Sequence, residues 1–269
     1  YPDIKTYKKL MVKNLIENNV GPYNRKKVIN YLNRELTRKT FSKRNTIYRK
    51  EEEWGSNCYQ ENLKKPFHAV VHNGDNYDGD NSITGEDFSD HHPLMDVSLG
   101  RPICRKVDEL TNHLTPLLDQ SKQIVFVDPY FRADRKAYLK PLEQFLKIIQ
   151  SNPNKIKRTT IAYHHNDGDG KGEYFTADKI KEIYQLKLKS IIPNGVKLSL
   201  FKWPHAEMHN RYVLTDIMGV SYGNGLSEGS NSLRDEDEIN PLDKKTYKER
   251  YEKYNNQLRK PYLIVDNDS

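Results

Sequence analysis

From residue 106 to residue 222, short apolar runs alternate with stretches whose apolar residues recur at helical spacing. Helical spacing covers residues 106–120, 139–149 and 180–188. Strands are expected at Ile124–Val127, Thr159–Tyr163, Val196–Phe201, Arg211–Thr215 and Val220–Tyr222. Strands that alternate with helices of this length favour a layered α/β domain, because each helix can bury its apolar face against a sheet. The sequence therefore predicts the α/β fold class.

The rest of the chain is organised around this pattern. Tyr247, Tyr251 and Tyr254 follow one another at helical spacing, and the apolar run Tyr262–Val265 comes after them. They predict a C-terminal helix and a final strand. The expected organisation is a basic helical arm over 1–65, a short strand and acidic Gly/Asp-rich loop over 66–101, the α/β domain over 102–232, and the C-terminal helix and strand over 233–269.

Positive charge is concentrated at the N-terminus. Residues 1–50 hold 14 Lys and Arg against three acids, a net charge of +11, whereas the whole chain carries +7. Apolar residues at helical spacing predict two helices there, on either side of Gly21-Pro22. Such an arm suits nucleic acid or an anionic membrane surface, with a solvated helical face as the alternative. The candidate nucleic-acid-binding residues are Arg25, Lys26, Lys27, Arg34, Arg38 and Lys39.

The acidic loop differs sharply from this arm. Residues 66–100 contain seven acids and no Lys or Arg, and a short strand is expected at Phe67–Val71. Residues 75–86 have the length of a calcium-binding loop. Tyr77 and Gly79 stand where two of the calcium ligands should be, so a calcium site is not predicted.

Composition argues against integral membrane and secreted proteins. Only 35% of the residues are hydrophobic, and the longest apolar runs, such as Ile124–Val127, are a few residues long. A membrane-spanning helix needs about 20 apolar residues, and the N-terminus has no apolar signal segment. The cysteines, Cys58 and Cys104, are too few and too far apart for a disulfide framework or a Cys-based zinc site. A cytoplasmic protein is therefore expected.

The clearest chemical pattern is formed by His209, Arg211 and Asp216. Residues two apart on a strand share a face, so His209 and Arg211 should project together, with Glu207 beside them if the strand begins that early. A His and a cation on one face combine a nucleophile with an oxyanion clamp. Asp216, just past the strand, could orient either group.

Two further features accompany this pattern. Gly223-Asn224-Gly225-Leu226 follows the next expected strand, and its glycines would let the backbone approach a bound phosphate. Asp128 directly follows the strand Ile124–Val127, where α/β sheets usually gather functional groups. A turn-forming Asp before Pro129 is the alternative interpretation of Asp128.

This spacing resembles the phospholipase D superfamily motif, His-x-Lys-x4-Asp-x6-Gly-Ser-x-Asn. His209, Asp216 and Gly223 match it, and Arg211 stands in place of the Lys. Asn224 replaces the Ser, and a Leu replaces the final Asn. With Asp-Pro-Tyr after the first strand and Gly-x-Gly-Leu, residues 102–232 are most similar to the phospholipase-D-like C-terminal domain of MIT-domain proteins and to bacterial relatives.

The resemblance implies one half-unit of a phospholipase-D-like layered α/β domain and a phosphodiesterase that needs no metal or other cofactor. In that chemistry His209 would form a phosphohistidine, Arg211 would hold the phosphate, and Asp216 and Asn224 would support them. The chain carries one complete motif, whereas the chemistry needs two. A homodimer that places two His209 across a twofold axis is therefore expected.

The first functional hypothesis is a metal-independent nuclease, with DNA preferred over RNA as partner, in restriction or anti-phage defence. The alternative is a non-catalytic phosphate-binding module for nucleic acid or an anionic lipid head group. Loss of the motif's Ser and Asn favours this alternative, and the resembled branch is associated with phosphoinositide binding. A third hypothesis is an interaction protein built on a degenerate domain.

Other polar residues are weaker candidates. Asp128, His164, Glu207 and Glu228 could line the same pocket, and Glu228 could orient the His209 ring or be an exposed loop residue. Metal binding is the alternative for a few His-containing groups, but polar His-rich loops are usually solvated, so no metal site is predicted. These groups are His164-His165 with Asp167 and Asp169, His68 with His72, and His91-His92.

The basic arm should set affinity for nucleic acid. Replacing Arg25, Lys26 and Lys27 together by Ala removes three candidate phosphate-binding cations. The slope of log K against log salt on duplex DNA should then flatten by up to about 0.9 for each phosphate that is no longer neutralised. Fluorescence anisotropy across a salt series measures the slope. An unchanged affinity and slope would identify the three residues as a solvated face.

Overall fold

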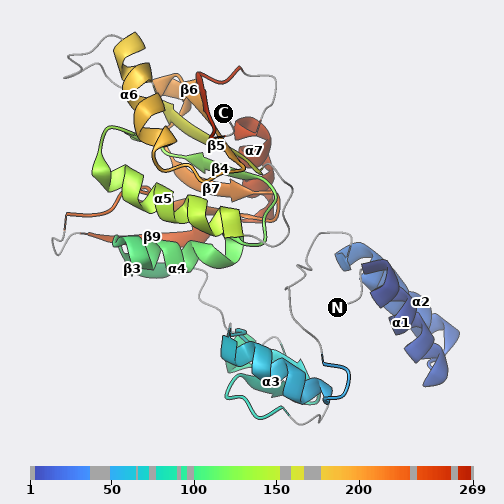
Figure 1. Ribbon diagram of the computed structural model, residues 1–269. Helices are drawn as coiled ribbons and strands as arrows, with labels where there is room; N and C mark the ends of the chain where they lie inside the picture. Colours follow the sequence, from blue (N-terminus) through green and yellow to red (C-terminus); the bar gives the residue numbers. More distant parts are fainter. Residues whose placement is uncertain are drawn as a thin grey trace. The chain divides into compact units, whose positions relative to one another are not determined.

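The computed structural model of the chain describes residues 4–36, 49–64, 66–72, 77–89, 92–95, 100–151, 159–166, 177–230, 235–255 and 260–267. The chain forms two compact units, Tyr1–Ser98 and Leu99–Ser269 (Figure 1). The second unit is an α/β structure, as the alternating pattern predicts.

The second unit is built on an eight-stranded sheet with the order β10-β6-β5-β4-β7-β8-β9-β3. The strands β4, β5 and β6 run parallel, and every other neighbouring pair is antiparallel. The bounds are β3 (Arg101–Cys104), β4 (Ile124–Val127), β5 (Thr159–Asn166), β6 (Val196–Trp203), β7 (Arg211–Thr215), β8 (Gly219–Tyr222), β9 (Glu236–Pro241) and β10 (Leu263–Val265).

Helices cover both faces of this sheet (Figure 1). One face packs against α4 (Val107–Leu118), α5 (Lys136–Ser151) and α6 (Ala177–Lys189), in a core that includes Phe126 and Phe145. The opposite face packs against α7 (Lys244–Tyr254). None of the described helices is at once long and apolar enough to cross a membrane.

The strand directions bring several chain segments to one edge of the sheet. Because β7 runs antiparallel to β4, the first residue of β7, Arg211, lies beside the end of β4, where Asp128 follows. The carboxyl ends of β3 and β8 and the start of β9 lie at the same edge. We call this edge, with Arg105, Asp128–Tyr130, Arg211, Gly223–Ser227 and Asp237, the Asp128 edge.

Most of the elements expected between residues 106 and 222 are present, and β4 and β7 have the expected bounds. Two differences affect the domain description. β5 extends to Asn166, so His164 lies on a strand and not in a loop. The segments 102–232 and 233–269 share one sheet, because β9 pairs with β3 and β8, and β10 pairs with β6.

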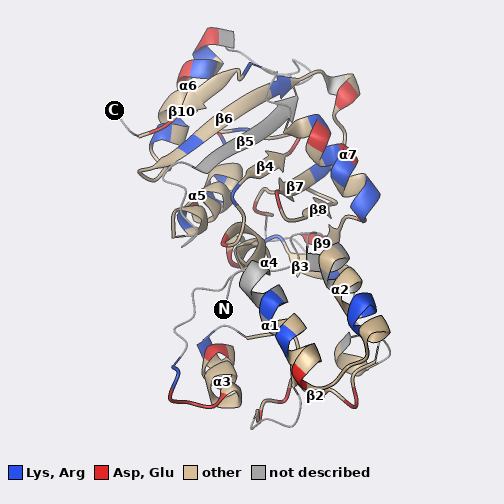
Figure 2. Ribbon diagram, turned by 90° about the vertical axis from the view of Figure 1, so that its right-hand side faces the viewer, with Lys and Arg blue, Asp and Glu red and all other residues tan. Residues whose placement is uncertain are grey.

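The first unit begins with the two expected helices, α1 (Ile4–Glu17) and α2 (Pro22–Leu36), which contact each other. Figure 2 shows Lys and Arg along both of them. Lys26 and Lys27 are exposed and Arg25 is half-buried, with the Lys27 Nζ 4.6 Å from the ring centroid of Tyr23. Arg34 lies on α2, where only its backbone is described. Arg38 and Lys39 lie outside the described residues.

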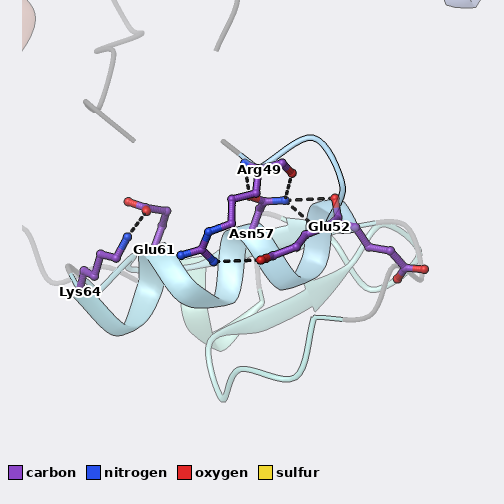
Figure 3. Close-up of polar contacts among 6 residues, drawn as sticks. Arg49, Glu52, Asn57, Glu61 and Lys64 are labelled. Carbon is purple, nitrogen blue, oxygen red and sulfur yellow. Dashed lines mark hydrogen bonds and ion pairs between the residues drawn. The ribbon is translucent and has the colours of Figure 1, made fainter. Parts of the chain in front are cut away.

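The helix α3 (Trp54–Lys64) lies within the segment 1–65 expected to be a helical arm, although no separate helix is expected at these residues. A buried side chain, Asn57, ties its first turn to the preceding segment (Figure 3). The Asn57 side chain accepts a hydrogen bond from the Arg49 backbone N (2.9 Å) and donates to the Arg49 backbone O (2.9 Å). It also donates to the backbone oxygens of Glu52 and Glu53.

Two short parallel strands, β1 (Val70–His72) and β2 (Ser82–Thr84), follow α3, and η1 (Pro93–Met95) is a 3-10 helix. The strand β2 lies inside the segment expected to be a loop, where Ile83 is buried. The Nε2 atoms of His68 and His72 contact the Leu94 backbone O and the Ser82 Oγ. Among the described residues, no group of three or more His, Cys, Asp and Glu could hold a metal ion; His91, Asp167 and Asp169 lie outside them.

Replacing Phe126 by Ala should destabilise the second unit by about 3–5 kcal/mol, the usual cost of removing a buried Phe side chain. Phe126 is fully buried on the central strand β4 and stacks on Phe145 with ring centroids 5.6 Å apart. The buried Trp203 lies in this unit, so its fluorescence in a Trp54→Phe background follows urea unfolding of this unit alone.

Leu186→Ala on α6 is the matched control, because Leu186 is 71% exposed. It should change the unfolding free energy by less than about 0.5 kcal/mol. Equal effects of the two substitutions would contradict the placement of β4 in the core.

Candidate functional site

A buried carboxylate organises the Asp128 edge. Asp128 is 1% exposed, and it follows a strand whose four residues are all buried. One carboxylate oxygen accepts a hydrogen bond from the Tyr130 backbone N (2.9 Å), and the other accepts one from the Leu226 backbone N (3.2 Å). Asp128 therefore fixes both its own turn and the glycine-containing segment after β8.

The charge of Asp128 is compensated only in part. Burial raises the pKa of Asp128, while the two backbone hydrogen bonds and the positive charges of Arg211 and Arg105 oppose this rise. Within the described part of the chain, no ion pair within 4.0 Å joins Asp128 to either arginine. Both arginines are therefore near Asp128 without a direct ion pair to it.

Arg211 lies half-buried beside Asp128. Its Nη1 donates to the Gly223 backbone O (2.7 Å), and its guanidinium carbon lies 4.8 Å from the ring centroid of Tyr130. Its Nε is buried and has no hydrogen-bond partner among the described residues. A guanidinium has five N–H donors; of these, one donates to Gly223 and the Nε–H is buried.

The glycines allow this close packing. Gly225 has φ +87°, and a Cβ placed on it would lie 2.5 Å from Asp128 Oδ2 and 3.2 Å from Arg211 Cδ. A Cβ on Gly223 would lie 2.6 Å from Asp237 Oδ1. Only glycine leaves room for the carboxylates and the guanidinium at these positions.

A second carboxylate, Asp237, holds the other side of this turn. Asp237 is buried on β9 and accepts hydrogen bonds from the backbone N atoms of Gly223 (2.7 Å) and Asn224 (2.8 Å). The Asn224 side chain donates to the Glu236 backbone O (3.2 Å). Asn224 is exposed, but both its backbone N and its side chain are hydrogen-bonded to the start of β9.

Arg105 is a member of the edge that the sequence interpretation misses. It follows β3, and its Nη2 donates to the backbone O (3.1 Å) and the Oγ of Ser227. Its Nε is buried without a partner among the described residues. Burial, followed by the nearby Asp128 carboxylate, raises the pKa of Tyr138 to about 12. The edge therefore gathers two arginines and two buried acids, and Tyr138 of α5, near Asp128, stays protonated.

The strand expected to align Glu207, His209 and Arg211 does not form as predicted. β7 begins at Arg211, and Glu207 lies in the 3-10 helix η2 (His205–Glu207). Pro204 ends β6, and its carbonyl accepts a hydrogen bond from the Glu207 N (3.0 Å), which closes this turn. His209 is exposed and precedes the strand, so strand geometry does not set its direction relative to Arg211.

Asp216 lies at the opposite edge of the sheet from Arg211. It follows the last residue of β7, and its Oδ1 accepts hydrogen bonds from the backbone N atoms of Lys122 (2.8 Å) and Gln123 (3.2 Å), which precede β4. The five residues of β7 separate the two positions, so the interpretation of Asp216 as an orienting group for His209 or Arg211 is wrong.

Of the remaining pocket candidates, Glu228 contacts α5, whereas His164 lies at the Asp128 edge. Glu228 forms an ion pair with Lys140 of α5 (3.0 Å), and its backbone N donates to the Ala137 O (2.7 Å). These contacts direct it to α5 and not to the His209 ring. His164 pairs with Val127 in the β4–β5 ladder and so shares the Asp128 edge at the level of the backbone.

The Asp128 edge is thus suited to an anion. Guanidinium groups form strong, charge-assisted hydrogen bonds with phosphate. Gly223 and Asn224, which adjoin Arg211, are exposed residues. The described members contribute no cluster of metal ligands. Their chemistry therefore fits recognition of a phosphate oxygen by Arg211.

No family model and no curated protein sequence matches the chain. Among solved structures the chain is similar to TrmBL2, described as an archaeal chromatin protein that shows a novel mode of DNA binding. The sequence identity is 9% and the TM-score is 0.32, and the match covers 65% of this chain and 56% of that chain. A likeness at this TM-score carries no argument about what the present chain does.

Replacing Gly225 by Ala should disturb the Asp128 edge. The left-handed backbone alone costs a residue with a Cβ about 1–2 kcal/mol, and the new methyl group would also displace Asp128 or Arg211. Urea unfolding, followed by Trp203 fluorescence in the Trp54→Phe background, measures the destabilisation. Leu186→Ala is the control, because Leu186 is exposed and lies in the same unit as Gly225 and Trp203. Equal stability of the two variants would refute the packing described for Gly225.

Proposed function

We propose that the Asp128 edge binds a phosphodiester group of nucleic acid, with Arg211 as the anchor. The observation that carries this proposal is the position of Arg211, beside two glycines and in no ion pair within the described part of the chain. Arg211 is held by Gly223 and Tyr130, so its guanidinium is ordered before a ligand arrives. Less conformational entropy is then lost on binding.

Nucleic acid is favoured over a lipid head group because of the first unit. Residues 1–50 carry a net charge of +11, and exposed lysines lie on α2. Positive charge concentrated in this unit favours a polyanion over a single head group, because each added Lys or Arg can neutralise a further phosphate. DNA is proposed ahead of RNA as the ligand.

A second candidate function is hydrolysis of that phosphodiester by a phospholipase-D-like half-unit. His209 is exposed and lies two residues before Arg211 at the same end of β7. In this reaction a ring nitrogen of His209 attacks phosphorus, and the departing oxygen takes a proton from a second histidine. Water then attacks phosphorus and gives a proton back to the second histidine, and the phosphorus–nitrogen bond breaks to release the product and His209. The second histidine would come from the partner subunit of a homodimer, and no metal takes part.

Binding is the better supported of the two functions. His209 does not lie on the strand that was expected to align it with Arg211. Asp216 lies at the opposite edge of the sheet, and the Asn224 side chain donates a hydrogen bond to the Glu236 backbone O. Each of these features belongs to the motif that suggests catalysis. The geometry of Arg211 depends on none of them.

Arg211→Ala should weaken binding of a fluorescein-labelled DNA oligonucleotide by about 10- to 150-fold, because a hydrogen bond to a charged group contributes about 1.5–3 kcal/mol. Arg211→Lys keeps the positive charge but lacks the planar, paired donors of a guanidinium, so its affinity should lie between those of the unmodified protein and Arg211→Ala. Arg101→Ala is the control, because Arg101 is an exposed arginine at the other end of β3. Equal affinities of the Arg211→Ala and Arg101→Ala proteins would overturn the proposal.

Incubation with labelled DNA in EDTA separates the two functions. If hydrolysis occurs, His209→Ala should abolish it and leave affinity nearly unchanged, because its bond to phosphorus forms only during the reaction. The cleaving species should sediment as a dimer. Cleavage that survives His209→Ala would refute its role as nucleophile, and Arg211-dependent binding without cleavage leaves binding as the function.

A further inference from the structure

We infer that Tyr130 is a stacking platform for a nucleotide base, and that the ligand of the Asp128 edge is single-stranded nucleic acid. The inference rests on the proposed function, since Arg211 supplies the phosphate contact that Tyr130 complements.

Tyr130 is exposed although the residues on both sides of it are buried. Its side chain is 54% exposed, whereas Phe131 is 2% exposed and Pro129 is buried. Phe131 packs edge-on against Tyr138 and Tyr184, with ring centroids 5.7 and 6.0 Å away. The buried neighbours provide the packing of this segment, so the exposure of Tyr130 is not needed for folding.

The backbone at Tyr130 is held firmly. Its N donates to Asp128 Oδ1 (2.9 Å), and the Phe131 N donates to the Asp128 backbone O (3.2 Å). Only the two side-chain torsions of Tyr130 remain free, and the guanidinium of Arg211 limits these by lying 4.8 Å from the ring centroid. An aromatic surface with so little freedom loses little entropy when a base stacks on it.

Tyr130 and Arg211 together match the two chemically distinct parts of a nucleotide. A base and its phosphate are one sugar apart, and here an aromatic ring and a guanidinium are immediate neighbours. Arg211 would bind the phosphate while the exposed surface of Tyr130 receives the base. Proteins that bind single strands combine aromatic stacking with positive charge in this way.

Tyr130 and Arg211 together would favour single-stranded nucleic acid over other ligands that contain phosphate. In a duplex, the faces of each base are covered by neighbouring bases, so Tyr130 could stack only on an unpaired base. A phosphoinositide head group offers phosphate but no aromatic face. Single-stranded nucleic acid is the ligand that uses both residues.

The test compares Tyr130→Ala and Tyr130→Phe in the full chain. The probes are a single-stranded oligothymidylate, a strand of equal length with abasic sites, a duplex, and vesicles containing a phosphoinositide. Tyr130→Ala should weaken oligothymidylate binding by about 5- to 150-fold, the equivalent of about 1–3 kcal/mol for one stacked base. It should change abasic-strand and duplex binding far less, and Tyr130→Phe should retain near-native affinity.

Phe88→Ala is the control for removal of an exposed aromatic residue, because Phe88 is 46% exposed and lies in the first unit. Arg211→Ala reports separately on the proposed function, since it should weaken binding of all the nucleic-acid probes. Equal reductions in affinity for base-bearing and abasic strands in Tyr130→Ala would overturn the stacking role. Tight vesicle binding that exceeds oligothymidylate binding and ignores Tyr130→Ala would also overturn it.

Discussion

The buried carboxylate of Asp128 is the interaction on which the Asp128 edge depends. It accepts backbone hydrogen bonds from its own turn, at Tyr130, and from the segment after β8, at Leu226. A buried charge is costly without such partners, and an unsatisfied buried N–H would cost about 1–3 kcal/mol. The same carboxylate therefore fixes the backbone at Tyr130 and the glycine turn, and its charge lies near the two arginines.

The sheet explains why these groups meet. The antiparallel sense of β7 and β9 places Arg211 and Asp237 at the edge where β4 and β8 end. Asp237 holds the glycine turn from one side and Asp128 holds it from the other. Both carboxylates accept hydrogen bonds from backbone N–H groups, and Arg211 forms an ion pair with neither of them. We propose that its partner is an external anion. The proposed phosphate recognition thus depends on the sheet topology and not on a single motif.

The sequence predicts the central elements well and the edge chemistry less well. Apolar runs bounded by polar residues define β4 and β7, and the Asp-Pro pair marks the strand end at Asp128. β9 escapes prediction because Asp237 fills one of its buried positions, where an apolar residue is expected. Arg105 is missed with β3. The Asn57 network that ties the first turn of α3 to the preceding segment is also missed, because spacing does not encode such side-chain contacts.

The motif around His209 shows why spacing alone misleads. The motif's residues would share one site only if a continuous strand ran from Glu207 to Arg211. Instead, Pro204 follows the end of β6, and residues 205–207 form a 3-10 helix. Asp216 does follow the strand as expected, but a strand has two ends, and Asp216 lies at the one away from Arg211. Strand direction and pairing, which spacing does not encode, decide which residues share an edge.

A crystal structure of the chain with a bound phosphodiester dinucleotide would show whether Arg211 binds phosphate. A phosphate oxygen is expected at hydrogen-bond distance, about 2.7–3.2 Å, from the guanidinium of Arg211. Asp128 should still accept the N–H groups of Tyr130 and Leu226 in that complex. A dinucleotide bound elsewhere, with Arg211 still donating only to Gly223, would contradict the account.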